Sequence, residues 1–231
     1  MSAAPLVELR DLTKVYGSGE SEVKALAGVS LKIEAGEFVA VMGASGSGKT
    51  TCLNMLGCLD AATAGQYLFC GLDVTPLTLD QRALLRRSYL GFVFQGFNLL
   101  ARTSALENVE LPLVYRRVAA AERRQSALRA LEEVGLGDRV QHLPSELSGG
   151  QQQRVAIARA IVSQPRMLLA DEPTGNLDSA RKVEIMNLLQ ALNRDRHLTI
   201  VMVTHEPDMA AFASRVIHFK DGLIERDTAP A

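Results

Sequence analysis

The sequence is short of the features that mark metal-binding, disulfide-stabilised and nucleic-acid-binding proteins. It has no tryptophan and only three cysteines, Cys52, Cys58 and Cys70, among 231 residues. Because their number is odd and their spacing matches no metal site, we expect reduced, structural thiols. Basic residues do not outnumber acidic ones, and the net charge is −1. A dedicated nucleic-acid binder usually carries a basic excess, so we expect no nucleic-acid partner.

Long apolar runs are missing as well. No stretch approaches the roughly 18 apolar residues that a membrane-spanning helix needs. Residues 1–5 lack the basic and then apolar pattern of a signal peptide. We therefore expect a soluble chain that takes part in any membrane process through another protein.

What the chain does have is the composition of a packed globular protein, with 47% hydrophobic and 22% charged residues. Apolar patterns predict an α/β core interrupted by a helical segment. The predicted strands are 7–12, 29–33, 38–42, 65–71, 167–170 and 199–203, with a hairpin at 216–225. One predicted helix begins at residue 51, and three more span 119–134, 149–163 and about 183–192. We expect residues 1–231 to form one domain, with 1–96 and 161–231 as the core and 97–160 as an inserted helical lobe.

A glycine-rich loop follows the apolar strand 38–42. Residues 43–50 match the phosphate-loop pattern G-x-x-x-x-G-K-[ST], in which backbone N–H groups surround a polyphosphate. Lys49 would reach the outer phosphates, Thr50 would ligate Mg²⁺, and the N-terminus of the following helix would face the phosphates. The alternative is a chance match in a flexible turn. The predicted nucleotide-binding residues here are Gly43, Ala44, Ser45, Gly46, Ser47, Gly48, Lys49, Thr50 and Thr51.

Two carboxylates follow the buried strand 167–170 directly. Asp171, at the carboxyl end of a central strand beside the phosphate loop, is placed to hold Mg²⁺. Glu172 could act as the general base that polarises the attacking water. Without the phosphate loop, the same pair would be read as an ordinary turn at a strand end.

The segment Leu147-Ser-Gly-Gly-Gln151 stands immediately before a predicted helix. Ser148 suits a helix N-cap, and the glycines leave backbone N–H groups free to meet an anion. A capped helix start is the alternative interpretation, and it would account for the serine and one glycine.

With these residues in place, the sequence resembles the ATP-binding subunits of ABC transporters. Residues 147–151 are similar to the signature motif of that family and precede Asp171 by the family's spacing, and the resemblance extends from about Val7 to Glu225. It implies an α/β fold with a P-loop NTPase core, a mainly parallel sheet, an N-terminal antiparallel β part and an inserted helical lobe. It also implies ATP and Mg²⁺ as cofactors and ATP hydrolysis as the reaction.

The resemblance assigns further roles, each with a plainer alternative. Tyr16 corresponds to the aromatic residue that stacks on adenine, or is an exposed aromatic. Gln95 corresponds to the glutamine that contacts Mg²⁺ and the water, or is a loop residue. Asp178 corresponds to a loop that crosses a dimer interface, or is a helix N-cap. His205 corresponds to the histidine that contacts the γ-phosphate, or is a surface histidine. Ser148, Gly149, Gly150 and Gln151 would contact nucleotide across the dimer.

Within the family, residues 94–100, 105–113 and 170–178 are similar to the lipoprotein-release and macrolide-export group. The resemblance implies a membrane permease partner with four spans and a periplasmic domain, and a location at the cytoplasmic face of the bacterial inner membrane. It also implies an ATP-dependent homodimer that holds two ATP molecules. The alternatives are a cell-division ATPase that controls wall hydrolases and, from another class, a soluble ABC ATPase without a transport role.

The segment 97–114 carries apolar residues in a lobe that we expect to have a limited core. We predict that part of this surface receives a short cytoplasmic helix of the permease. The alternative is that all of them pack inside the lobe. The residues in question are Phe97, Leu99, Leu100, Leu106, Leu111 and Leu113.

Overall fold

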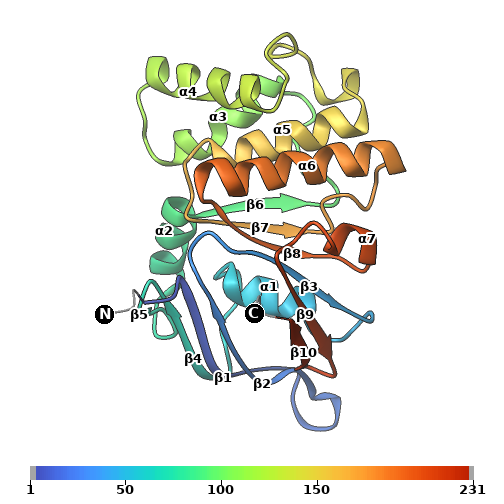
Figure 1. Cartoon of the computed structure of the whole chain (residues 1–231). Coiled ribbons are helices and arrows are strands. Elements are labelled where there is room, and N and C mark those ends of the chain that lie inside the picture. The colour runs from blue at the N-terminus through green and yellow to red at the C-terminus, as the bar shows by residue number, and fades with distance from the viewer. Residues whose placement is uncertain (1–3, 229–231) are drawn as a thin grey trace.

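The structure, a computed structural model, describes residues 4–228 of the chain, apart from the side chain of Glu20. Two β-sheets and the helices that cover them make up the fold (Figure 1). One sheet has four strands in the order β2-β1-β4-β5, and the other has six in the order β10-β9-β3-β8-β7-β6. Helix α1 (Lys49–Leu56) packs between the two sheets, in a buried cluster that includes residues of both.

The smaller sheet is antiparallel throughout. Leu9, Leu12 and Leu26 are fully buried on the face that packs against α1. The register of β1 against β2 shifts between Leu9 and Leu12, where Asp11 takes a positive φ of 47° and lets the strand bulge. The strands are β1 (Val7–Tyr16), β2 (Val23–Ile33), β4 (Ala64–Phe69) and β5 (Leu72–Asp73).

The larger sheet is parallel except at its edge, where β10 pairs antiparallel with β9. Its central strands are buried on both faces, which is why they read as continuous apolar runs instead of alternating patterns. The strands are β3 (Phe38–Gly43), β6 (Leu90–Phe94), β7 (Met167–Asp171), β8 (Thr199–Val203), β9 (Arg215–Lys220) and β10 (Leu223–Thr228).

Four helices lie on one side of the larger sheet, with α5 and α6 next to it and α3 and α4 farther out (Figure 1). Leu106, Leu131 and Ile157, from α3, α4 and α5, belong to the same buried cluster as Leu168 and Ile200 of the sheet. The helices are α2 (Leu79–Tyr89), α3 (Ala105–Tyr115), α4 (Ala120–Glu133), α5 (Gly149–Ile161), α6 (Ser179–Arg196) and α7 (Pro207–Ala210), with short 3-10 turns at Gly19–Ser21 and Pro144–Glu146.

The predicted α/β fold with an antiparallel N-terminal part is confirmed. The predicted helices at 119–134 and 149–163 are found within two residues of their expected ends, and the hairpin turns at Asp221 and Gly222, both with positive φ. Segment 97–160 is mainly helical, but its helices share one core with the sheet, so the lobe boundaries stay a prediction.

Helices α2 and α3 were not predicted from the sequence, each for a different reason. Helix α2 has no buried residue, so it offers no apolar periodicity, and only its capping box of Thr78 and Gln81 marks its start. Helix α3 is apolar on most sides and contains Pro112, which argues against a helix. Its start is nevertheless fixed by a capping box of Ser104 and Glu107.

No helix in the described residues is both long enough and apolar enough to cross a membrane.

Close contact between β6 and α5 yields a stability prediction. A Cβ added at Gly91 would lie 2.5 Å from the main-chain oxygen of Ala160, so Gly91→Ala must push the helix from the sheet. We expect a loss of about 1–3 kcal/mol in the free energy of unfolding, as for other overpacked sites. Gly96→Ala is the matched control, since its nearest atom is the side-chain oxygen of Asn98 at 3.4 Å. Chemical denaturation of both variants checks this, and equal stabilities would contradict it.

Candidate functional site

The loop between β3 and α1 forms a cradle of main-chain groups. Gly43, Gly46 and Gly48 all have positive φ values, of 148°, 78° and 103°. At Gly48 a Cβ would also lie 2.5 Å from the main-chain oxygen of Ala25, so only glycine fits. The loop therefore wraps tightly around the N-terminus of α1, whose first N–H groups face the cradle.

Two side chains of this loop fit an anionic ligand. The ammonium of Lys49 is buried and donates hydrogen bonds to the main-chain oxygens of Gly43, at 2.9 Å, and Ala44, at 2.7 Å. The Ser47 hydroxyl is buried without a hydrogen-bond partner. A buried cation and an unpaired hydroxyl within a ring of N–H groups suit a polyphosphate.

The parallel register brings the other predicted residues to the same edge of the sheet. Val41, Val203, Asp171 and Phe94 are neighbours across β3, β8, β7 and β6. The residues that follow these strand ends are therefore neighbours too, which places Gln95, Glu172 and His205 beside the phosphate loop. Ligands bind at this carboxyl edge in open α/β sheets.

The carboxyl group of Asp171 is in an unfavourable place for a negative charge. Burial and the nearby charge of Glu172 raise the pKa of Asp171, and the ammonium of Lys49 partly offsets that rise. The described residues contain no cluster of three or more His, Cys, Asp or Glu side chains placed to hold a metal. A divalent ion at Asp171 would therefore need the hydroxyl of Thr50, the amide of Gln95, water or phosphate oxygens as further ligands.

Glu172 and His205 contact each other. The distance between Nδ1 of His205 and Oε1 of Glu172 is 2.8 Å. The backbone of Glu172 is strained, with a φ of 45°, while its N–H donates to the main-chain oxygen of Val203. Both side chains keep access to solvent, at 27% for Glu172 and 61% for His205. The pair can therefore meet a water and a terminal phosphate.

Gln95 is held by the loop that follows β7. Its Nε2 donates to Oδ1 of Asn176 at 3.2 Å, and Nδ2 of Asn176 donates to the main-chain oxygen of Gln95 at 3.0 Å. Gly175 allows this approach, because a Cβ there would lie 2.6 Å from Nε2 of Gln95. No local sequence pattern reveals this contact, because Gln95 and Asn176 lie 81 residues apart in the chain.

The signature segment forms a capped helix start. Ser148 and Gln151 make a reciprocal capping box at the N-terminus of α5. The capping box accounts for Gln151 without a ligand. Contact with a nucleotide stays a prediction for Ser148, Gly149, Gly150 and Gln151. Asp178 likewise caps α6 by accepting from the N–H of Arg181 at 3.0 Å.

Tyr16 ends β1 and is 41% exposed. Burial of part of the ring is the main cause that raises the pKa of Tyr16, and the Thr51 hydroxyl, in the first turn of α1, acts in the opposite direction. Tyr16 therefore lies near the phosphate loop, and its stacking on adenine stays a prediction.

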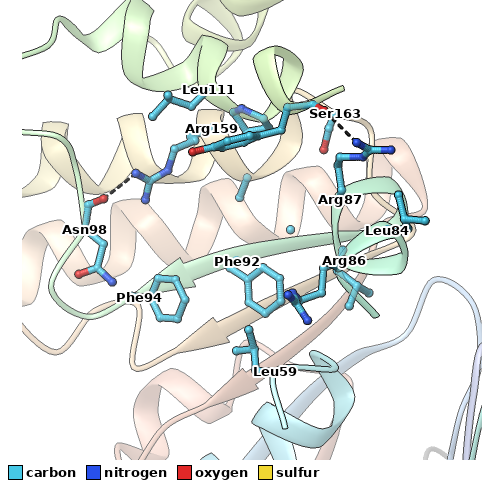
Figure 2. Close-up of a pocket in the computed structure, with 16 residues that line it drawn as sticks. Leu59, Leu84, Arg86, Arg87, Phe92, Phe94, Asn98, Leu111, Arg159 and Ser163 are labelled. Carbon is cyan, nitrogen blue, oxygen red and sulfur yellow. Dashed lines mark hydrogen bonds between the residues drawn. The ribbon is translucent and has the colours of Figure 1, made fainter. Parts of the chain in front are cut away.

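A second cavity, of about 700 Å³, opens between α2, β6, α3 and α5. Figure 2 shows Phe92 and Phe94 on its floor, with arginine side chains around them. Leu111 lines it, whereas Leu106 and Leu113 are buried in the core and Leu99 packs against that core. Part of the apolar set in segment 97–114 therefore packs inside the fold, and the binding of a permease helix by another part stays a prediction.

Comparison with known proteins gives concordant matches. The family described as "ABC transporter" matches residues 26–175. The macrolide export ATP-binding/permease protein MacB of Hyphomonas neptunium is 54% identical over 97% of this chain, and the pyoverdine export ATP-binding/permease protein PvdT of Pseudomonas aeruginosa is 52% identical over 97%. The chain spans about a third of the length of these curated relatives, 35% and 34%.

Two solved structures share the fold. A dimeric, post-hydrolysis state of the ATP-binding cassette MJ0796 with ADP and Pi is 46% identical, with a TM-score of 0.88 over 96% of this chain and 98% of that one. The cbiO1 protein of Clostridium perfringens, part of the ABC transporter complex cbiONQ, is 29% identical, with a TM-score of 0.89 over 98% and 89%.

The charge on Asp171 leads to a second prediction. Asp171→Asn removes a buried charge beside Glu172, so we expect the metal-free variant to melt a few degrees above the wild type at neutral pH. The pKa of Asp171 is raised in the folded chain, so at a pH near or above the ordinary Asp value the folded chain binds more protons than the unfolded chain. Wild-type stability thus falls as the pH rises from the ordinary Asp value towards the raised one.

The advantage of Asp171→Asn should therefore vanish as the pH falls below the ordinary Asp range. Thermal unfolding in EDTA from about pH 3 to pH 8 measures it. Asp138→Asn is the control, since that side chain is 71% exposed. A variant less stable than the wild type at neutral pH would contradict the prediction.

Proposed function

The chain belongs to the ABC transporter family and is an ATPase of that family, and from this premise we propose that it drives an exporter of the macrolide-export or lipoprotein-release type. The similarity to export proteins of two different cargoes supports this assignment. The alternative within the family is a cell-division ATPase that regulates wall hydrolases. A soluble ABC ATPase without a transport role is a weaker alternative.

One observation carries the catalytic part of the proposal. The phosphate loop, Asp171, Glu172, Gln95 and His205 meet at one edge of the parallel sheet. This is the set of groups that hydrolysis of the phosphoanhydride bond of ATP needs: a phosphate cradle, a cation, a base and a partner that orients the base.

Each group has a role in the proposed reaction. The loop and Lys49 bind the phosphates of ATP, and Lys49 stabilises the charge that develops on the transferred phosphate. Glu172 accepts a proton from the attacking water, and His205 holds the carboxylate of Glu172 through their 2.8 Å contact. His205 also contacts the γ-phosphate.

The donor set at Asp171 fits Mg²⁺. Asp171, Thr50 and Gln95 offer the oxygen ligands that this ion prefers, and burial and the charge of Glu172, which raise the pKa of Asp171, make a carboxylate that a divalent cation would stabilise. When bound, Mg²⁺ would neutralise charge on the phosphate oxygens.

We further propose an ATP-dependent homodimer. The signature residues would contact the ATP of the partner subunit, and Asp178 would lie near the twofold axis. Dimeric structures of a cassette that is 46% identical over 98% of its length support this arrangement. Hydrolysis would remove the γ-phosphate that both subunits hold, so opening and closing would follow the nucleotide.

The groove between α2 and α3 is the proposed contact with a four-span permease. Its lining is mainly apolar, and Arg86, Arg87 and Arg159 lie around it (Figure 2). A short amphipathic helix with acidic residues at its ends would match such a surface. The contact would hold the chain at the cytoplasmic face of the inner membrane.

A paired experiment tests the ATPase and the dimer together. Glu172→Gln keeps the shape of the side chain but removes the base, so we expect ATP to bind without turnover and to trap the closed dimer. Lys49→Ala removes the ammonium group that would contact the outer phosphates, so we expect loss of both binding and turnover, by about 100-fold or more. Light scattering with and without Mg-ATP, together with phosphate release, measures both.

The two variants separate the two parts of the proposal. Normal hydrolysis by Lys49→Ala would overturn the assignment of the phosphate loop. Binding of ATP by Glu172→Gln without any dimer, alone or with the permease, would overturn the dimer and leave the ATPase intact.

The groove leads to a further prediction. Tyr115 lines the groove and is 67% exposed, so Tyr115→Glu should weaken permease binding at least about tenfold while sparing basal ATPase activity. Leu72→Glu is the control, since Leu72 is 72% exposed on β5, away from the groove.

The measurement is the fraction of the chain recovered with membranes that contain the separately expressed permease part of the Hyphomonas neptunium relative. Equal recovery of both variants would place the contact elsewhere.

A further inference from the structure

Tyr16 is held by a small cluster of charged groups. Its hydroxyl donates to Oδ2 of Asp60 at 2.8 Å, and Nζ of Lys14 donates to Oδ1 of the same carboxylate at 2.8 Å. Lys14 Nζ also lies 4.7 Å from the centre of the Tyr16 ring. The Asp60 carboxylate therefore fixes the orientation of the Tyr16 ring, and the Lys14 ammonium covers one face of that ring.

Lys14 and Asp60 are less exposed and have more hydrogen-bond partners than the members of a typical surface ion pair. The side chain of Lys14 is 12% exposed and that of Asp60 is 32% exposed. Lys14 donates a second hydrogen bond, of 2.8 Å, to the main-chain oxygen of Ala61, and the N–H of Ala61 donates to Oδ1 of Asp60 at 2.7 Å. Because both charged groups have several partners, holding them costs less entropy for each contact.

The protonation states support the same arrangement. Burial tends to raise the pKa of Asp60, but hydrogen bonds from Lys14, Ala61 and Tyr16 outweigh it and lower that pKa. Burial and the hydrogen bond to Asp60 raise the pKa of Tyr16. The carboxylate is thus charged and the phenol is protonated at neutral pH, so the donor and the acceptor are both present.

The chain connects this cluster to the phosphate loop. Helix α1 begins at Lys49, and its chain reaches Asp60 four residues after the helix ends at Leu56. Asp60 therefore links the ring at the end of β1 to the element whose N-terminus faces the phosphates. The distance between ring and phosphate cradle is set by one short helix.

We propose that Asp60 and Lys14 are positioning residues for the base of the nucleotide. Lys14 covers one face of Tyr16 and Asp60 fixes its tilt, so the remaining exposed face is presented to the adenine at a fixed distance from the phosphate cradle. The proposal rests on the proposed ATP function. It adds two residues that do not touch the phosphates and that control how well the base stacks.

A ligand without a base separates this role from a structural one. Inorganic tripolyphosphate carries the phosphates of ATP but has nothing to stack on Tyr16. We define the base ratio as the dissociation constant of Mg-tripolyphosphate divided by that of Mg-ATP. A residue that only supports the fold changes both constants together and leaves the ratio unchanged.

Calorimetry on the 231-residue chain gives both constants. We expect Tyr16→Ala to lower the base ratio about tenfold or more, since it removes the stacking surface. Asp60→Ala, Lys14→Met and Tyr16→Phe should each lower it on the order of threefold to tenfold. The double variant with Tyr16→Phe and Asp60→Ala should lose no more than the larger single effect, because both remove the same hydrogen bond.

Glu8→Ala is the matched control. Glu8 also pairs with a lysine of the smaller sheet, Lys32, at 3.3 Å, but has no contact with Tyr16. It should leave the base ratio unchanged. Tyr16→Phe keeps the experiment decisive if Asp60→Ala fails to fold, because it removes the hydrogen bond without removing a charge.

The outcomes separate the inference from the function on which it rests. If Tyr16→Ala lowers the base ratio and the Asp60, Lys14 and Tyr16→Phe variants do not, the positioning role is wrong and ATP binding at this site stands. If Tyr16→Ala itself leaves the ratio unchanged, the base does not bind at Tyr16 and the proposed placement of ATP fails.

Discussion

Backbone pairing among four parallel strands is the constraint on which the site depends. Hydrogen bonds between β3, β8, β7 and β6 align Val41, Val203, Asp171 and Phe94 at one level. A shift of one residue in any pair would move a strand end by about 3.3 Å and turn each side chain to the other face. Burial on both faces of the sheet penalises such a shift, so packing in the core sets the geometry of the candidate site.

The same strands connect the site to the groove. Phe92 and Phe94 of β6 line the groove, and the next residue, Gln95, reaches the site. Arg159 of α5 lines the groove as well and donates to the main-chain oxygens of Phe97 and Asn98, at 2.8 and 2.6 Å. Since segment 94–98 is held from both sides, the proposed partner in the groove and a nucleotide at the strand ends would act on the same few residues.

Sequence reasoning could predict the candidate site because its residues stand at strand ends, where apolar runs stop abruptly, as at Asp171. It did not find Asn176 or Asp60 as partners of Gln95 and Tyr16, because contacts between loops far apart in the chain leave no local pattern. It could not tell Leu106 and Leu113 from the groove residues, because an apolar helix shows no periodicity that separates its buried side from its groove side. Helix α2 escaped notice for the opposite reason, since none of its side chains is buried.

Several unfavourable features lie at the carboxyl edge of the larger sheet, although comparable ones, such as the unpartnered Nε of Arg82 and the positive φ of Cys58, occur elsewhere. Glu172 has a positive φ, Asp171 has a raised pKa beside a second carboxylate, and Ser47 has a buried hydroxyl without a partner. Each costs stability in the chain without ligand, and a cation or phosphate oxygens would compensate the carboxylate charge and the unpaired hydroxyl but not the backbone conformation of Glu172. Ligand binding must therefore stabilise the folded chain beyond the contacts it forms.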